Sequence, residues 1–334
     1  MATITTIADL QMVPSKFSQY IIEQTTKKSA LVRSGVAVAV PQVSQLINGT
    51  PKGGNMVTIP FYKPLSGDDE VFGEEEMTPG KVETGADVAT LLIRQRAWGD
   101  TDLAKVFGGA DPLAAIASML GDYWNEREQA IALNVLAGLF DGGTAALKDH
   151  ILDVSTAEGT DCIISVDNTL DTKQLMGDAA DKLGVVFMHS ATYTELQKQQ
   201  KIETEYNSDL KIKIDYYLGY EVVVDDDMPV SGGVYTTYFV GKGAFARNDG
   251  MPQGLVGVEK TRKALSSTNY LINRRAFVLH PMGCAFNANA TFAGNKKYAS
   301  NADLAKAANW KAAKDLKNIP IVALKHKLTA NVAG

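Results

Sequence analysis

One stretch decides the fold of this chain: TPKGGNMVTIPFYKPLSGDDEVFGEEEMTPGKVETGADVATLLIRQRA, residues 50–97. Two segments rich in apolar and β-branched residues, 56–62 and 88–93, flank a Gly-rich acidic stretch, which is typical of two strands joined as a long hairpin. Because a two-stranded ribbon is only marginally stable in water, we expect it to pack on another surface. Other copies of the chain in an assembly would supply that surface. An ordinary surface hairpin of a monomer is the alternative.

The first strand of the hairpin carries the apolar contacts that we predict with a neighbour. Side chains of a strand alternate between its two faces, so one face can turn towards another subunit. Met56, Ile59 and Phe61, or their alternates, are expected to pack there.

Charge supplies a second predicted contact. Residues 66–87 hold eight carboxylates and one lysine, a local charge of −7, whereas residues 295–334 hold eight lysines and two aspartates, a local charge of +6. Complementary charge steers and orients association between proteins. The residues predicted to contact each other are Glu74, Glu75 and Glu76 of the hairpin and Lys296 and Lys297 of a neighbour.

The composition is that of a globular protein. With 334 residues, 45% of them hydrophobic, the chain is long enough for two or more lobes. The formal net charge of −5 argues against nucleic-acid binding through bulk charge. Cys162 and Cys284 are too few and too far apart for a disulfide framework. The N-terminus lacks a basic and apolar leader, and no apolar run approaches the roughly 20 residues that span a bilayer, so we expect synthesis in a cytoplasm and no membrane partner.

A long helix is predicted after the hairpin. Asp111 can cap a helix and Pro112 suits its first position, while Gly142 and Gly143 favour an end. Apolar residues recur between them at three- and four-residue spacing, and about 30 residues at roughly 1.5 Å each give a length on the order of 40 Å. The solvated face of this helix is expected to carry Asp122, Glu126 and Glu128, which argues against an acid/base pair there.

Segments on both sides of this helix complete a mixed α/β pattern. A short helix over 14–26 and an extended segment over 31–40 would form an N-terminal arm. Downstream, we predict helices over 171–183, 190–200 (capped by Ser190) and 302–314 (containing Trp310), and strands over 185–189, 212–216, 220–224, 235–240, 275–280 and 319–328.

Four segments in this order resemble those of a known family. They are the strand-to-helix step VVFMHSATY at 185–193, the glycine-led strand and acidic turn LGYEVVVDDDMP at 218–229, the glycine turn within 238–247, and the segment 259–286 with RRAFVLHPMG at 274–283. The chain is similar in these segments to the major capsid proteins of tailed bacteriophages. Those proteins have the Hong Kong 97-type fold, which encapsulin shells share.

The resemblance implies a domain organisation and a function. The expected fold is α+β, and its parts are an N-terminal arm (1–49), an extended hairpin or E-loop (50–97), a peripheral domain with the spine helix (98–145 and 255–295), an axial domain (146–254) and a C-terminal segment without an assigned place (296–334). The implied protein is a major capsid subunit that self-assembles as pentamers and hexamers into the icosahedral head shell around the phage genome. It would be made in the cytoplasm of the bacterial host and reside in the virion.

The same resemblance implies partners. A separate scaffolding protein is expected because the arm begins within twenty residues of the start. A portal and packaged DNA, bound without sequence specificity, are the other implied partners, and a decoration protein is left open. An encapsulin-type nanocompartment shell is the alternative within the fold.

Residue patterns for catalysis or metal binding are missing from the sequence. His150, His189, His280 and His326 lie in separate segments without the paired spacing of a zinc site. The adjacent residues 225–227 are all aspartates, which cannot all point at one cation, so an acidic turn is expected. No GxSxG, P-loop or dinucleotide fingerprint occurs. We therefore predict no catalytic, cofactor-binding or metal-binding residues and no enzyme; the alternative of another class is a hydrolase or transferase without a short motif.

Overall fold

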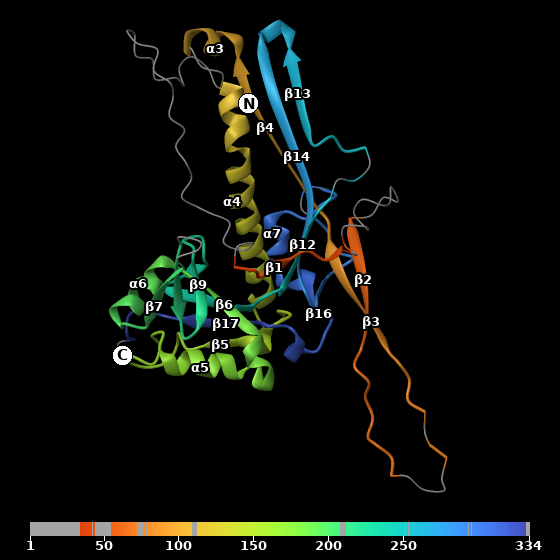
Figure 1. The fold of residues 1–334 in the computed structure, drawn as a ribbon, viewed down its shortest axis with the longest axis vertical. Coiled ribbons are helices and arrows are strands. Elements are labelled where there is room, and N and C mark those ends of the chain that lie inside the picture. The colour runs from red at the N-terminus through yellow and green to blue at the C-terminus, as the bar shows by residue number, and fades with distance from the viewer. Residues whose placement is uncertain are drawn as a thin grey trace.

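The computed structural model describes residues 34–41, 43, 55–71, 76–77, 79–108, 112–207, 212–250, 252, 254–292, 294 and 296–331. The molecule is elongated: a body carries a hairpin at one end and a stem, made of a long helix and long strands, at the other (Figure 1). The helix predicted over 14–26 lies outside the described residues. Within the segment predicted to be extended over 31–40, the short strand β1 (Ala37–Val38) is described.

The predicted hairpin is present. Strand β2 (Met56–Tyr62) pairs antiparallel with β3 (Thr84–Thr90), in a register that joins Met56 to Thr90 and Tyr62 to Thr84. The second strand predicted over 88–93 is displaced, because β3 ends at Thr90 and Leu92 begins β4 (Leu92–Thr101), a strand of a different sheet. We call residues 55–61 and 85–90 the arm root and residues 62–84 the outer arm.

The long strand β14 (Thr268–Pro281) is the centre of the first sheet. Its first part pairs with β4 on one side and with β13 (Val258–Lys263) on the other, and its last part pairs with β12 (Phe245–Asp249), which pairs with β1. The strand predicted over 275–280 is the last part of β14. Strand β13 was not predicted because its sequence VEKTRK is polar, and all of its side chains are exposed.

The predicted long helix is confirmed as α4 (Pro112–Phe140), which follows the short helix α3 (Asp102–Gly108). Its Ile131 and Val135 side chains are buried as expected. The prediction for Glu128 was wrong: its carboxylate is buried, and it accepts hydrogen bonds from two guanidinium nitrogens of Arg247. Burial is tolerated because this paired cation compensates the charge that is withdrawn from water.

The second sheet contains eight of the described strands and mixes parallel and antiparallel pairs, in the order β5-β17-β11-β6-β9-β8-β7 with β10 paired to β11. The predicted strands over 185–189, 212–216, 220–224, 235–240 and 319–328 all belong to it. The bounds are β5 Ile151–Asp153, β6 Leu183–Met188, β7 Ile202–Asn207, β8 Ile212–Tyr217, β9 Tyr220–Val224, β10 Val230–Ser231, β11 Val234–Gly241 and β17 Ile321–His326.

The first helix beside this sheet lies earlier in the chain than predicted. Helix α5 spans Val166–Gln174, and a 3₁₀ helix covers Gly177–Lys182, where one helix over 171–183 was expected. The Ser165 hydroxyl accepts a hydrogen bond from the Asn168 amide and so starts the helix early. Gly177 then takes a φ of 56°, which interrupts it.

The second helix, α6 (Ser190–Lys198), has a different cap from the one predicted. Ser190 is its first residue, and the Nδ1 atom of His189 accepts the hydrogen bond from the Ala191 amide at 3.0 Å. The His189 imidazole therefore caps the helix in place of the predicted serine hydroxyl. A cap is needed because the first amides of a helix have no acceptor within the helix itself.

The C-terminal segment joins both halves of the molecule. Helix α7 (Asn301–Leu304) packs on α4, and β17 lies between β5 and β11 in the second sheet. The helix predicted over 302–314 was wrong, since Trp310 begins the strand β16 (Trp310–Ala312), paired with β15 (Cys284–Phe286). The Trp310 indole donates a hydrogen bond to the Leu304 carbonyl at 2.7 Å, which holds the chain in this reversal.

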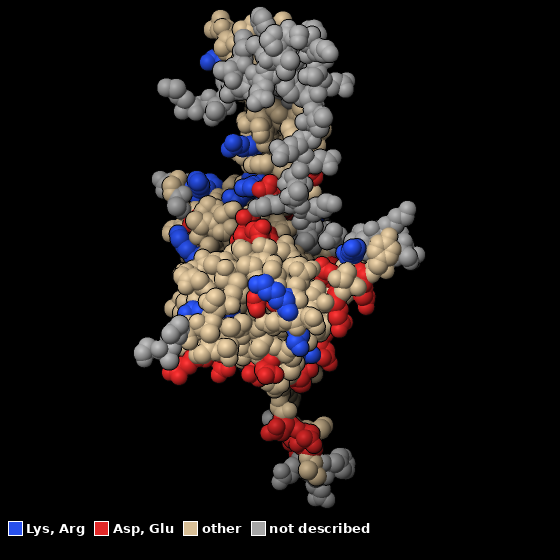
Figure 2. All heavy atoms as spheres, turned by 90° about the vertical axis from the view of Figure 1, so that its left-hand side faces the viewer, with Lys and Arg blue, Asp and Glu red and all other residues tan. Residues whose placement is uncertain are grey.

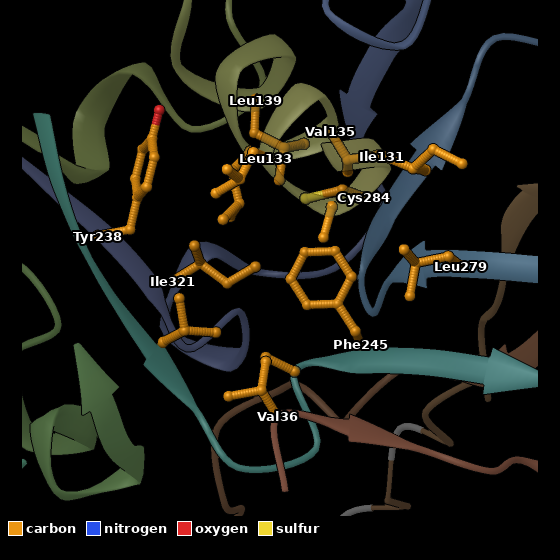
Figure 3. Packing of buried hydrophobic residues seen from close by; sticks show 14 of the residues in the cluster. Val36, Ile131, Leu133, Val135, Leu139, Tyr238, Phe245, Leu279, Cys284 and Ile321 are labelled. Atoms are coloured by element: carbon orange, nitrogen blue, oxygen red, sulfur yellow. The ribbon is translucent and has the colours of Figure 1, made fainter. Parts of the chain in front are cut away.

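The largest hydrophobic cluster lies where α4 meets both sheets. Figure 3 shows Ile131, Val135 and Leu139 of the helix facing Phe245 and Leu279 of the first sheet, with Ile321 and Tyr238 of the second sheet beside them. Cys284 lies in this cluster, and both cysteines are buried as free thiols. A second cluster packs α6 and the residues on either side of α5 against the second sheet, and a third lies under the arm root.

Candidate assembly surfaces

The outer arm exposes large apolar side chains to solvent. It extends away from the body as two segments of the polypeptide, and no other strand of the described residues pairs with them (Figure 1). Exposed apolar groups gathered on one element are typical of an interaction surface rather than of a free monomer. Their exposed fractions are 77% for Tyr62, 82% for Leu65, 94% for Val71, 79% for Met77 and 61% for Val82.

Sequence reasoning missed Leu65, Val71, Met77 and Val82, whereas Tyr62 belongs to the first strand and is one of the alternates allowed there. It placed the apolar contacts in the first strand, where β-branched residues made the hairpin recognisable. The available signal was the recurrence of single apolar residues within the acidic stretch, where no intramolecular core could cover them.

The predicted contacts in the first strand lie at the arm root. Met56 is half-buried against the largest hydrophobic cluster, and Ile59 is half-buried against the cluster under the root. Phe61 lies across Gly85, where an added Cβ would come within 2.8 Å of two of its ring atoms. These three side chains therefore contact their own subunit, and only their remaining exposed surface is available to another one.

The predicted charge contact is described only in part. Glu74 and Glu75 lie outside the described residues, Glu76 is exposed on the outer arm, and Lys296 and Lys297 are exposed. The Asn55 side-chain amide donates a hydrogen bond to the Lys297 carbonyl at 3.0 Å, which places this lysine beside the arm root. Since Glu76 lies in the outer arm, the two ends of the proposed contact are separated within one subunit.

The opposite end of the molecule is a second apolar surface. It comprises α3 and the turn between β13 and β14, at the top of Figure 1. Leu265, at the centre of that turn, is fully exposed, and Ser267 follows it in the left-handed region at a φ of 47°. Leu103 and Val106 of α3 are also exposed at this end.

Charges are unevenly distributed over the molecule. Figure 2 shows carboxylates on the described part of the outer arm and along the lower edge of the body, and Lys and Arg residues along the stem above them. The arm and the stem of two copies are therefore electrostatically compatible, whereas two arms would repel each other.

A buried polar network holds the arm root. His280 Nε2 lies 2.8 Å from one carboxylate oxygen of Asp87, and the Gly283 amide donates a hydrogen bond to the other at 2.7 Å. Both side chains are 1% exposed. Burial alone would raise the pKa of Asp87, but the hydrogen bonds from His280 and Gly283 outweigh it and lower that pKa, so Asp87 is a carboxylate at neutral pH.

The other polar residues singled out in the sequence have structural roles. Asp225 accepts hydrogen bonds from the Asp227 amide and the Gln129 side chain, which is the acidic turn that we predicted. His150 Nδ1 donates a hydrogen bond to the Ile321 carbonyl at 3.0 Å, and burial lowers the pKa of His150. Burial also lowers the pKa of His326, to about 4. Within the described residues no three His, Cys, Asp or Glu side chains could hold a metal ion together, and no helix is long and apolar enough to cross a membrane.

Comparison with known proteins gives the family. No family model matches the sequence. The chain is 38% identical over 333 residues to the major capsid protein of Bacillus phage SPP1, in an alignment that covers 98% of this chain and 99% of that protein. It belongs to the bacteriophage major capsid proteins. A member of this family is a structural protein of the virion and not an enzyme, and it self-assembles into capsid oligomers.

Solved capsid structures place this phage capsid protein in the Hong Kong 97-type fold. The capsid of a native GTA particle matches with a TM-score of 0.57 and 12% identity, over 95% of this chain and 96% of that one. The cyanophage Pam1 capsid matches with a TM-score of 0.56 and 10% identity, over 97% and 100%. The SrpI encapsulin of Synechococcus elongatus matches with a TM-score of 0.54 and 10% identity over 100% of this chain and 99% of that one, a likeness of fold alone.

Proposed function

We propose that this capsid protein assembles as pentamers and hexamers into an icosahedral head shell that encloses the phage genome. The observation that carries the proposal is the outer arm, whose large apolar side chains the described part of their own subunit leaves exposed. A closed shell of identical subunits gives every arm a neighbour, so the same contact repeats without a free end.

We assign the parts of the chain as the sequence predicts, with two refinements. The N-terminal arm is 1–49, the E-loop 50–97, the peripheral domain 98–145 and 255–295, and the axial domain 146–254. The boundary after residue 97 divides β4, whose whole length pairs with β14, so β4 fits the peripheral domain better. Within the segment 296–334, α7 packs against the spine helix α4, and β17 pairs with β11 in the sheet of the axial domain.

We also propose three partners for this capsid protein. A separate scaffolding protein would control assembly in the host cytoplasm, a portal would occupy one vertex, and packaged DNA would touch the inner surface without sequence-specific contacts. The net charge of −5 supports weak DNA contact, because few counterions would be released.

The test is assembly of the purified protein, alone and with candidate scaffolding protein expressed from the same phage. Light scattering and negative-stain images are expected to show closed shells of uniform diameter. A compact monomer at all concentrations, with and without scaffold, would contradict the proposal. Nanomolar, sequence-specific binding of the unassembled subunit to duplex DNA at physiological salt would contradict the proposed role of the inner surface.

A further inference from the structure

The arm root is linked to the body by a continuous polar chain rather than by apolar packing alone. One carboxylate oxygen of Asp87, on β3, faces His280 of β14, and the other accepts the Gly283 amide in the turn before β15. The Gly283 carbonyl in turn accepts the backbone amides of Ala313 at 2.8 Å and Lys314 at 3.2 Å. Asp87 on the arm thus bonds directly to residues 280 and 283 of the body, and it is linked through Gly283 to residues 313 and 314.

Lys314 completes the chain by returning to the other strand of the arm. Its ammonium lies 5.3 Å from the ring centroid of Phe61, on β2, within the range of a cation–π contact. The same ammonium contributes a favourable charge to Asp87. Phe61 is followed by Tyr62, which is 77% exposed, so this contact is the last one before the outer arm leaves the body.

These polar contacts restrict the direction of the arm root relative to the body more than apolar packing alone would. Apolar side chains can slide past one another at little cost, whereas a buried carboxylate that loses a donor is left with an uncompensated charge. The ring of His280 is further held between Asp87 and the indole of Trp310, at 6.3 Å between ring centroids. The root therefore tolerates one orientation of β3 relative to β14.

We propose that Asp87, His280 and Lys314 are positioning residues for assembly, which set the direction in which the outer arm leaves the subunit. This inference rests on the proposed contact between the arm and a neighbouring subunit. A change of direction at the root is multiplied along the arm, so it alters the angle between subunits more than it alters the stability of either.

The experiment measures arm direction in the unassembled subunit and shell geometry separately. Spin labels on Leu65→Cys and Asp181→Cys report the distance between outer arm and body, and the two native cysteines are buried and so protected from labelling. The variants are Asp87→Asn and Lys314→Met, with Lys314→Arg as the charge-conserving rescue. Lys317→Met, which removes an exposed pair with Asp178 in the same region of the chain, is the matched control.

Wild type, Lys314→Arg and Lys317→Met are expected to give one narrow distance distribution and shells of one diameter. Lys314→Met and Asp87→Asn are expected to broaden the distances at least twofold and to give shells of mixed diameter or open sheets, while Lys314→Met keeps the wild-type melting temperature. Unchanged distance distributions in both variants would overturn the inference, as would fewer shells that all have the wild-type diameter. If the distances broaden as expected but the wild type never forms shells, the proposed function fails and the positioning role at the arm root stands.

Discussion

Several of the ionisable side chains buried in this protein have hydrogen-bond partners that suit their charge state. Glu128 faces Arg247, and Asp87 faces His280 and a backbone amide. His326 is matched as a neutral ring: the Lys327 carbonyl lies 3.3 Å from Nδ1, which makes Nδ1 the donor, and Nε2 then accepts from the Thr237 hydroxyl at 3.0 Å. A proton added to His326 would place a positive charge in the buried centre of the second sheet, away from water.

We therefore predict that the subunit loses stability in mild acid through His326. Burial lowers its pKa to about 4, below the value near 6.5 of a free imidazole. Between these values the unfolded chain binds a proton that the folded one does not, so the stabilisation is complete above about pH 6.5, falls as the pH drops, and reaches a loss of about 3 kcal/mol near pH 4.

The measurement is urea unfolding of the unassembled subunit from pH 7.5 to 4.5, with His326→Gln as the comparison. The amide can keep both hydrogen bonds but does not titrate, so the stability difference between wild type and variant should shrink as the pH falls. A difference that is constant across this range would show that His326 does not titrate on unfolding. The stability of the variant should still fall somewhat with decreasing pH, because burial also lowers the pKa of His150.

Among the elements, the spine helix contains two glycines with opposite surroundings. At Gly121 an added Cβ would meet nothing within 4 Å, whereas at Gly138 it would collide with the Leu304 carbonyl and lie 2.9 Å from the Trp310 indole nitrogen. Gly138 therefore sets how closely α7 approaches α4, and Gly121 has no packing role within the subunit.

These two positions give a matched prediction. Gly138→Ala should destabilise the subunit by about 2 kcal/mol or more, because overpacking pushes α7 off the helix and strains the Trp310 hydrogen bond. Gly121→Ala should stabilise it by up to about 1 kcal/mol through helix propensity alone. Thermal unfolding measures both, and equal shifts for the two variants would show that the approach of α7 is not limited at Gly138.

The hairpin arm is expected to separate folding from assembly. Replacing 66–81 by a Gly-Gly turn removes a segment whose described residues belong to no core cluster, so the melting temperature should change by less than about 2 °C, roughly the shift that 1 kcal/mol produces in a chain of this size. Shell formation should need a higher protein concentration, since the exposed side chains of Val71 and Met77 are lost from the outer arm. Insoluble, protease-sensitive protein would instead place this segment in the core of its own subunit.

The spacing of apolar residues was enough to predict the elements that keep a regular helical or strand periodicity along their length. The hairpin and the spine helix were found this way, and so were most strands of the second sheet. Strand β13 has no apolar face, so its own sequence does not mark it as a strand. Trp310 lies in a strand because it pairs with β15 and because its indole donates a hydrogen bond to the Leu304 carbonyl, and neither contact can be recognised from the local sequence. The pair Asp87 and His280 joins residues 193 positions apart, and no sequence pattern reports such a distance.

The distribution of charge over the whole molecule also bears on assembly. Its outer arm is acidic, its stem carries much of the basic charge seen in Figure 2, and exposed lysines stand beside the arm root. Single exposed ion pairs are worth only about 0 to 1 kcal/mol, but in a shell each one is repeated at every equivalent interface. Small terms of this kind can decide at what concentration a shell closes.

Salt should reveal this contribution. Replacing Glu74, Glu75 and Glu76 by glutamine is expected to raise the protein concentration needed for assembly at low salt. The effect should fade at about 1 M salt, where the screening length is roughly 3 Å. A matched control removes the same charge from exposed positions of the body, Glu158→Gln, Asp161→Asn and Asp181→Asn. An unchanged threshold at low salt, or an equal effect of the control, would assign the acidic segment to solubility only.

The place of β17 in the second sheet has a consequence for synthesis on the ribosome. This strand lies between β5 and β11, and β5 pairs with no other described strand, although it leaves the ribosome long before β17 does. A nascent chain therefore cannot complete the sheet until every other strand of it has been translated. Each nascent chain thus presents its hairpin arm, which is translated first, while the second sheet of the same subunit is still incomplete.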